Sequence, residues 1–165
     1  GSNVLFTENF SGLVINNSIQ GIEISDSNDQ YSIVEAGAGV IWHELVLYSL
    51  EQNLGGIENL SLIPGKCGAA PIQNIGAYGV ELKDTFHSLK AIDKRTGNVH
   101  EFNANDCEFG YRDSIFKNKA RGQFIITHIS FSIFTYSSGP VDLANIAPAY
   151  PLNLPFAPPG RSRCS

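Results

Sequence analysis

The twenty residues from Ile63 to Leu82 read "IPGKCGAAPIQNIGAYGVEL". This segment holds four glycines, three alanines and two prolines, and Lys66 and Glu81 carry its only formal charges. Glycine and proline both disfavour the interiors of helices and strands, so we expect a long irregular loop here. We call residues 63–82 the glycine loop.

Two interpretations of the glycine loop stay open from its composition. Backbone that lacks side chains exposes N–H groups, which together bind anionic oxygens or the edge of a heterocycle. The same composition is also typical of a tight double turn between packed strands, because glycine tolerates positive φ and close approach. Gln73 and Asn74 add amide donors and acceptors, which favours the binding interpretation slightly.

Before the glycine loop, the chain predicts strands and one helix. Strands are expected at 13–16 and 31–37, with the polar segment 25–30 as the turn between them. Apolar and small residues then recur at helical spacing, and "NLGG" at 53–56 ends the pattern; the helical positions are Trp42, Leu45, Val46, Ser49 and Leu50.

After the glycine loop, the pattern is mainly β. Residues 86–93 and 99–102 flank "KRTGN" and predict a hairpin, and residues 103–116 begin with residues that favour a helix start and end in mixed turn character. Residues 123–136 alternate in polarity over a length that predicts one long strand. The expected fold class is therefore α+β, with a mixed or antiparallel sheet and flanking helices.

The composition narrows the function classes. The chain has 165 residues, 42% hydrophobic and 16% charged, with a net charge of −5. A nucleic-acid partner is not expected, because no basic run is present. Three cysteines without a CxxC pairing favour a reducing compartment, and no signal peptide is recognised at the start. We therefore expect a soluble, cytoplasmic, monomeric protein with no membrane partner.

Proline marks the expected end of the folded unit. Six of the eight prolines lie in the last 26 residues, where their fixed φ and missing N–H disfavour both helix and sheet interior. We expect a folded region over 1–136 and an extended or disordered tail over 137–165.

The order of residues in the glycine loop is more specific for a protein family than its composition is. The segment closely resembles the flavin-binding signature of the UDP-N-acetylenolpyruvoylglucosamine reductase (MurB) family of bacterial peptidoglycan-precursor enzymes. Three further segments resemble that family in the same order: "GSNVL" at 1–5, "AGAGVIWHELV" at 36–46 and "CEFGYRDSIFK" at 107–117. The resemblance spans residues 1–136. It implies an FAD-binding lobe of the PCMH or vanillyl-alcohol-oxidase-like type, incomplete at its N-terminus.

The resemblance also implies roles for individual residues. Glu81 is expected to close the glycine loop by hydrogen bonding, while Tyr111 and Arg112 face the substrate and Arg112 pairs with an enolpyruvyl carboxylate as a catalytic residue. Without the resemblance, Arg112 would instead be a structural ion-pair partner of Asp113. The cofactor contacts would be Gly1, Ser2 and Asn3 around the FAD pyrophosphate, and Gly65, Gly68, Gln73, Asn74, Ile75, Gly76, Ala77 and Gly79 along the flavin.

In the family, NADPH reduces FAD, and FAD reduces UDP-N-acetylglucosamine enolpyruvate to UDP-N-acetylmuramate. The serine acid and the assisting glutamate of the family have no counterpart in this sequence. A truncated reductase is therefore the first hypothesis. Another flavin oxidoreductase with the same FAD-binding architecture and a non-catalytic flavin-binding remnant are the alternatives.

Other candidate residues carry weaker signals. His43 is expected to be a packing or surface residue, Cys67 an apolar filler rather than a redox thiol, and Ser114 no nucleophile, because it has no local base. No spacing of histidine, cysteine and carboxylate residues predicts a metal site.

Overall fold

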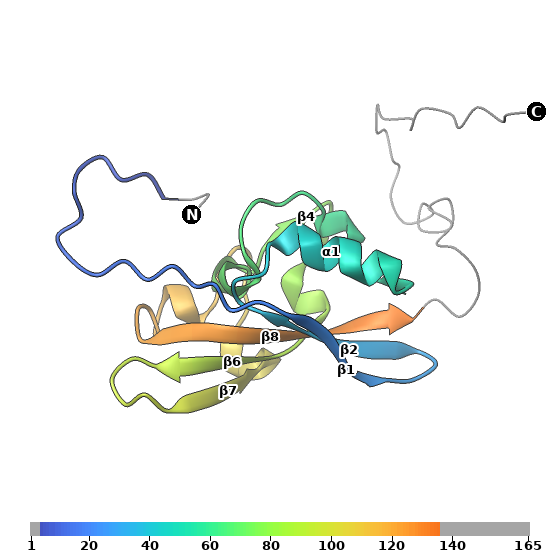
Figure 1. The fold of residues 1–165 in the computed structure, drawn as a ribbon. Helices are drawn as coiled ribbons and strands as arrows, with labels where there is room; N and C mark the ends of the chain where they lie inside the picture. The colour runs from blue at the N-terminus through green and yellow to red at the C-terminus, as the bar shows by residue number, and fades with distance from the viewer. Residues whose placement is uncertain (1–3, 136–165) are drawn as a thin grey trace, which may run out of the picture.

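A computed structural model of the chain describes residues 4–135. Its centre is a six-stranded sheet in the order β1-β2-β8-β6-β7, with β3 pairing to β8, and every pairing is antiparallel. One face of this sheet is covered by α1 and the glycine loop (Figure 1). The strands are β1 (Ile22–Ser27), β2 (Tyr31–Gly37), β3 (Leu54–Gly55), β6 (Phe86–Asp93), β7 (Val99–Asn103) and β8 (Phe124–Thr135).

The long strand β8 organises the sheet, because it pairs with β2, β3 and β6. Its side chains alternate between the two faces, as the sequence pattern predicts. Ile129, Phe131 and Ile133 are fully buried on the covered face. The core therefore lies between β8 and the elements above it.

Helix α1 (Trp42–Glu51) covers this row of β8 side chains. Its buried residues follow one helical face, and the Trp42 ring packs edge-on against Phe131 with centroids 5.7 Å apart. The indole Nε1 of Trp42 also donates to the carbonyl of Leu60 at 2.7 Å. The helix ends where expected, since Asn53 adopts a φ of 57° that α-helix does not allow.

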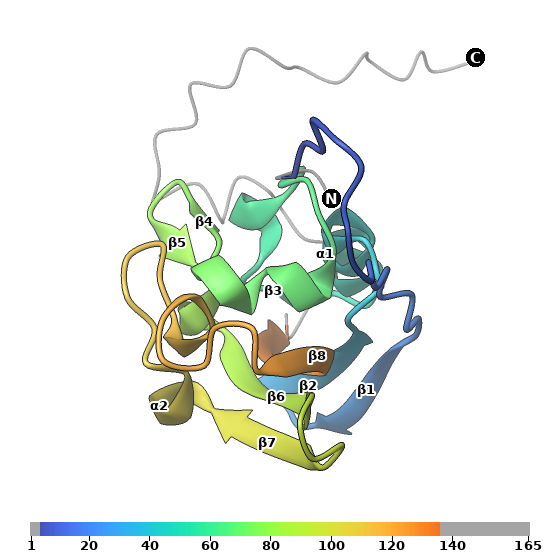
Figure 2. The same cartoon turned by 90° about the vertical axis from the view of Figure 1, so that its left-hand side faces the viewer.

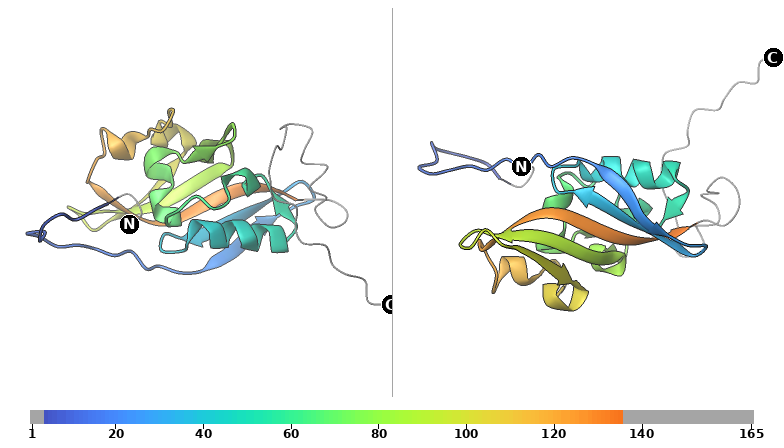
Figure 3. Two further views of the ribbon diagram at one scale, coloured as in Figure 1. Left: turned by 90° about the horizontal axis from the view of Figure 1, so that it is seen from above. Right: turned by 60° about the horizontal axis from the view of Figure 1, so that its bottom comes forward.

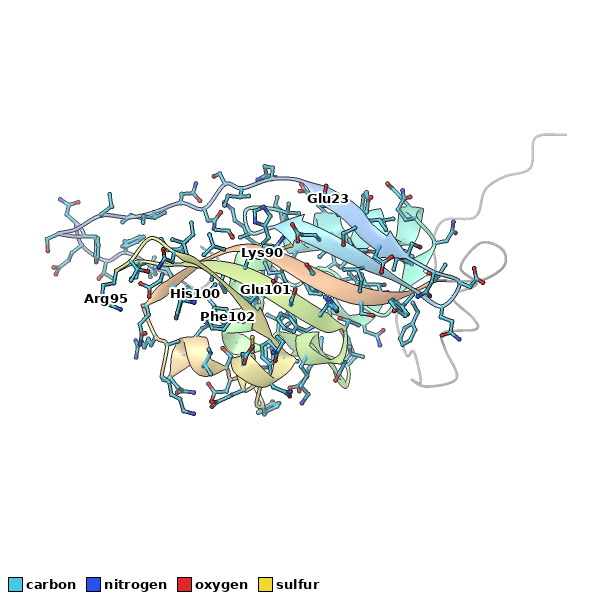
Figure 4. All side chains as sticks on the ribbon, turned by 90° about the horizontal axis from the view of Figure 1, so that it is seen from below. Glu23, Lys90, Arg95, His100, Glu101 and Phe102 are labelled. Atoms are coloured by element: carbon cyan, nitrogen blue, oxygen red, sulfur yellow. The ribbon has the colours of Figure 1, made fainter. Side chains whose placement is uncertain are left out.

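The opposite face of the sheet is polar (Figure 4). Glu23, Lys90 and Glu101 lie there on β1, β6 and β7, and Lys90 Nζ contacts the Glu35 carboxylate at 2.8 Å. The Lys90 ammonium and the Ser130 hydroxyl lower the pKa of Glu35 against the opposing effect of burial, which is the largest single influence.

The strand expected at residues 13–16 is wrong. Leu13 and Val14 are 83% and 58% exposed, and the strand that pairs with β2 is instead β1, over residues 22–27. β-Forming residues adopt a strand only where a partner edge is available, and here residues 22–27 occupy that edge. The expected turn shortens accordingly: Asn28 Oδ1 accepts the N–H groups of Gln30 and Tyr31.

Residues 4–20 form an extended arm, which we call the N-terminal arm (Figure 3). Its apolar side chains are largely exposed near its start, whereas residues 18–21 cross the backbone at Gly37–Gly39. Gly39 N–H donates to Ile19 O at 2.8 Å, and a Cβ on Gly39 would lie 2.5 Å from the Ser18 carbonyl carbon. Glycine is therefore required where the arm crosses the chain.

Two expectations for the second half are confirmed. Strands β6 and β7 form the predicted hairpin, and the short helix α2 (Ala104–Cys107) follows directly. Asn103 caps α2, because its side chain accepts the N–H groups of Asn105 and Asp106. The α+β class with an antiparallel sheet is thus the class that the sequence predicts.

Candidate functional site: three hollows around the glycine loop

The glycine loop is irregular, as its composition predicts. Short 3₁₀ turns occupy Cys67–Ala69 and Pro71–Gln73, and a small hairpin pairs β4 (Gly76–Ala77) with β5 (Val80–Glu81) (Figure 2). Another 3₁₀ turn, Glu58–Leu60, precedes the loop, and a fourth, Leu82–Asp84, begins at its last residue. Backbone bonds fix the loop to the start of α1, since Trp42 N–H donates to Gly65 O and Cys67 N–H to Val40 O. The loop is therefore a rigid part of the fold.

The glycine loop has an inner and an outer face. Cys67, Ala70 and Ile75 are buried in the core, while Ala69 and Ile72 are exposed on the outer side. A Cβ on Gly68 would lie 2.6 Å from the Cβ of Ala38, so this glycine is needed for close packing. The tight-turn interpretation therefore explains Gly68, and it leaves the outer face open for binding.

A first cavity, the loop hollow, lies on this outer face and has a volume of about 390 Å³. The glycine loop meets the N-terminal arm and the start of β8 around it, and most of its walls are apolar. It is lined by Ile15, Asn17, Ala38, Lys66, Gly68, Ala69, Ile72, Phe116, Ala120, Gly122, Phe124, Ile125 and Ile126. Flat apolar walls with few polar groups are typical of sites for aromatic ligands.

A second cavity, the arm hollow, measures about 250 Å³. It lies between the glycine loop and the arm, and Gly65, Gln73 and Ile75 of the predicted cofactor contacts line it. Lys66 and Ala69 line both this cavity and the loop hollow. The two cavities are thus neighbours across Lys66.

A third cavity, the hairpin hollow, lies at the β4–β5 hairpin and measures about 550 Å³. Gly76, Ala77 and Gly79 line it together with Lys83 and the two predicted substrate residues, Tyr111 and Arg112. The Tyr111 side chain is 85% exposed. The structure therefore divides the predicted site residues between different sides of the glycine loop.

Arg112 projects from a tight turn. Gly110 and Asp113 exchange two backbone hydrogen bonds, of 3.0 and 3.2 Å, which places Tyr111 and Arg112 at the tip. Arg112 has a φ of 55°, a conformation that costs a non-glycine residue roughly 1–3 kcal/mol. Lys117 Nζ donates to Arg112 O at 2.8 Å and helps to hold this conformation.

The Arg112 guanidinium bonds to backbone. One of its NH₂ groups donates to Gly76 O at 2.7 Å. The carboxylate of Asp113 accepts two bonds from Asn118 instead, and among residues 4–135 no ion pair joins it to Arg112. The structural ion pair is therefore wrong, and the remaining N–H groups of Arg112 are available at the hairpin hollow.

Asn74 lies beneath the hairpin hollow and is fully buried. Its Nδ2 donates to Gly110 O at 2.9 Å, and its Oδ1 accepts the Lys83 N–H at 3.0 Å. The side chain thereby ties the β4–β5 segment to the Arg112 turn. This position suits an internal bridge, whereas the sequence predicts Asn74 as a direct cofactor contact.

Glu81 closes the loop as expected. Its side chain accepts the Asp84 N–H in a capping box, and its carboxylate contacts Lys83 Nζ at 2.5 Å. The hydrogen bond from Lys83 lowers the pKa of Glu81, and the nearby Arg112 charge adds to this effect. The hairpin hollow thus carries two cations, Lys83 and Arg112, beside two carboxylates, Glu81 and Asp84. Both carboxylates are already engaged, Glu81 by Lys83 and Asp84 by the Glu81 N–H.

Three weaker candidates have internal roles. Burial raises the pKa of Cys67 to about 12, so its thiol is a filler and not a thiolate. Ser114 donates to Ile72 O at 2.7 Å, and His43 Nδ1 accepts the Leu62 N–H at 3.4 Å. The described part of the chain contains no group of histidine, cysteine and carboxylate side chains that could hold a metal ion.

Some predicted residues cannot be placed, and others were missed. Gly1, Ser2 and Asn3, and the tail at 137–165, lie outside the described residues. The sequence analysis missed Lys66, Asn17 and the aromatic wall formed by Phe116 and Phe124. Only Lys66 carried a visible signal, as the single cation of the glycine loop, because the other wall residues come from distant segments.

Comparison with known proteins agrees with a flavin site. The family described as "FAD binding domain" matches residues 1–103, so the chain belongs to the FAD binding domain family.

Individual relatives are more specific. The chain is similar to proteins named UDP-N-acetylenolpyruvoylglucosamine reductase, with 52% identity over 133 residues for that of Amoebophilus asiaticus and 51% for that of Burkholderia mallei. The matches cover 81% of this chain but 39% and 38% of those relatives. The chain therefore spans about two fifths of the length of these curated relatives.

A solved structure shows the same fold. The crystal structure of UDP-N-acetylenolpyruvylglucosamine reductase (MurB) from Thermus caldophilus aligns with a TM-score of 0.54 and 25% identity. This alignment covers 62% of the present chain and 37% of the Thermus chain. The flavin-binding α+β lobe expected from the sequence is thus confirmed.

The residues of the loop hollow suit FAD. Ile72, Phe116 and Phe124 offer apolar surface to an aromatic ring, while Gly68 and Gly122 keep part of the wall free of side chains. Asn17 and Lys66 supply the polar groups. A cavity of this make-up fits a ligand with one apolar ring system and one anionic part.

Proposed function

We propose that this chain is the FAD-binding region of a UDP-N-acetylenolpyruvoylglucosamine reductase. The observation that carries the proposal is the arrangement of the glycine loop, which has the apolar loop hollow on one side and the hairpin hollow with Arg112 on another. The family match supports FAD, and the names of the relatives support the reaction. NADPH is the proposed hydride donor and the UDP-sugar enolpyruvyl compound the substrate.

The chain's own residues position the substrate. Arg112 presents a planar guanidinium, and one of its N–H groups is held by Gly76 O. The other N–H groups bind the enolpyruvyl carboxylate, and they stabilise negative charge that develops on it during reduction. Tyr111, beside Arg112 at the tip of the turn, packs against the same substrate group. FAD, when bound, supplies the redox chemistry.

Asn74 and Glu81 support this arrangement without touching the substrate. Asn74 fixes the Gly110 carbonyl at the base of the Arg112 turn. Glu81 holds Lys83 by an ion pair and accepts the Asp84 N–H. The bond to Gly76 O orients the Arg112 guanidinium, which reduces the entropic cost of carboxylate binding.

The proposed setting is a monomer in the cytoplasm. No helix among residues 4–135 is long and apolar enough to cross a membrane. Cys67 and Cys107 are free thiols, which is consistent with a reducing compartment.

The proposal is tested by adding FAD to the purified chain and measuring the visible flavin spectrum and the binding constant. Binding of FAD, and a spectral change on adding the enolpyruvyl nucleotide that Arg112→Lys abolishes, would support the proposed function. Failure to bind FAD would contradict it. Binding of FAD without any response to the nucleotide would point to another flavin protein with the same lobe.

A further inference from the structure

Lys66 connects the glycine loop to the N-terminal arm. Its ammonium nitrogen donates to Asn16 Oδ1 at 2.9 Å and to Asn17 O at 2.6 Å, across about fifty residues of sequence. An ammonium group has three N–H donors, so these two bonds leave one for a ligand.

The charge of Lys66 is not neutralised by its contacts. Both acceptors are neutral oxygens, and among residues 4–135 no carboxylate forms an ion pair with Lys66. Three other lysines contrast with it, since Lys83, Lys90 and Lys119 each contact a glutamate. A positive charge held in place by neutral oxygens is suited to attract an anionic ligand.

The position of Lys66 identifies where that anion would lie. Its side chain lines both the loop hollow and the arm hollow, and among residues 4–135 it is the only cationic side chain in the lining of either. The loop hollow has apolar walls that suit an aromatic ring, so an anion beside Lys66 would lie at the boundary between that ring and the second cavity. A ligand with a ring system on each side of a diphosphate would fit this arrangement, with the diphosphate at Lys66 and one ring system in each cavity.

We propose that Lys66 binds the diphosphate of FAD, with Asn16 and Asn17 holding its ammonium group at the junction of the two hollows. This proposal rests on the proposed function, because it requires FAD as the cofactor. It adds a charged contact from the glycine loop, where only uncharged residues were predicted to contact the cofactor. It also gives the N-terminal arm a role in orienting that contact.

Three variants separate the charge of Lys66 from its structural role. Lys66→Gln keeps an N–H donor for the arm but removes the charge, and Lys66→Arg keeps the charge. Lys90→Met is the matched control, because it removes the same charge from the opposite face of the sheet (Figure 4). Riboflavin serves as the control ligand, since it carries the ring system of FAD without phosphate.

The experiment measures the dissociation constants of FAD and riboflavin for the purified chain and for each variant. Lys66→Gln should weaken FAD binding about ten- to a hundredfold and leave riboflavin binding within about twofold, as a lost charge-assisted hydrogen bond requires. Lys66→Arg and Lys90→Met should bind FAD like the unsubstituted chain. Added salt should weaken FAD binding less in Lys66→Gln than in the unsubstituted chain.

The outcomes separate this inference from the function on which it rests. Unchanged FAD binding in Lys66→Gln, or equal losses for FAD and riboflavin, would overturn the role of Lys66 while leaving FAD binding established. Failure of the unsubstituted chain to bind FAD would instead contradict the proposed function itself.

Discussion

The glycine loop and the N-terminal arm both lack regular secondary structure, yet they are held in very different ways. The loop is fixed by backbone bonds to the start of α1 and by the buried Asn74 side chain. The arm exposes most of its apolar side chains and is attached by a few polar contacts, among them Lys66 with Asn16. Irregular backbone is thus rigid where its polar groups are satisfied inside the fold.

The largest expected difference in stability between the two regions comes from shortening one apolar side chain in each of them. Ile75 in the glycine loop is 4% exposed, so Ile75→Ala should lower the free energy of unfolding by about 2–5 kcal/mol. Leu13 in the arm is 83% exposed, and Leu13→Ala should change the free energy of unfolding by less than about 0.5 kcal/mol. Chemical denaturation of both variants measures the difference, and equal losses would show that the arm packs as tightly as the loop.

Glycine substitutions should show the same contrast. Gly68→Ala places a Cβ 2.6 Å from Ala38, and this overpacking should cost about 1–3 kcal/mol of stability. Gly12→Ala in the arm meets only the Phe10 ring, which can move aside, so its melting temperature should stay close to that of the unsubstituted chain. A neutral Gly68→Ala variant would mean that the loop can shift away from residue 38.

Asn74 and Asn16 provide a matched pair of amides. Asn74→Asp removes the Nδ2 donor to Gly110 O and places a carboxyl group at a fully buried position, so it should cost about 1–3 kcal/mol of stability. Asn16→Asp keeps the oxygen that accepts from Lys66, so thermal unfolding should show little change or a slight gain. If Asn74→Asp has the same melting temperature as the unsubstituted chain, the buried Asn74 side chain does not help to hold the glycine loop.

The smallest expected effect is the pH dependence contributed by Glu81. The Lys83 ammonium lowers the pKa of Glu81 below its usual 4.5, so the folded state favours the ionised form. The stabilisation is therefore present above pH 4.5 and is lost as the pH falls through the lower folded-state pKa. Glu81→Gln should flatten the fall of unfolding free energy with acidification, and an unchanged slope would contradict this.

The sequence predicts the elements whose signals are local. Helix α1 follows from the spacing of Trp42, Leu45 and Val46, and β8 from its alternation. The strand expected at residues 13–16 is wrong because strand formation depends on a partner, which in this fold is taken by β1. Periodicity in the sequence indicates which side chains share a face of a strand. It does not indicate which of two β-forming segments pairs with the edge of the sheet.

The residues of the candidate site also fall into those that local sequence predicts and those that only the fold brings together. The residue order of the glycine loop predicts FAD, and that of residues 107–117 predicts a substrate role for Arg112, because each signal lies within a short segment. The walls of the loop hollow come from the arm, the Phe116 region and the start of β8, which only the fold brings together. The buried bridge made by Asn74 could not be predicted either, since burial depends on the Arg112 turn packing over it.

The central claim is that the glycine loop and the N-terminal arm together form the flavin site. Amide hydrogen exchange of the chain with and without FAD tests it most directly. Slower exchange with FAD at residues 66–73, at 15–17 and at 124–126, with unchanged exchange in the β6–β7 hairpin, is the predicted result. Bound FAD that slows exchange elsewhere and leaves these three segments unchanged would contradict the claim.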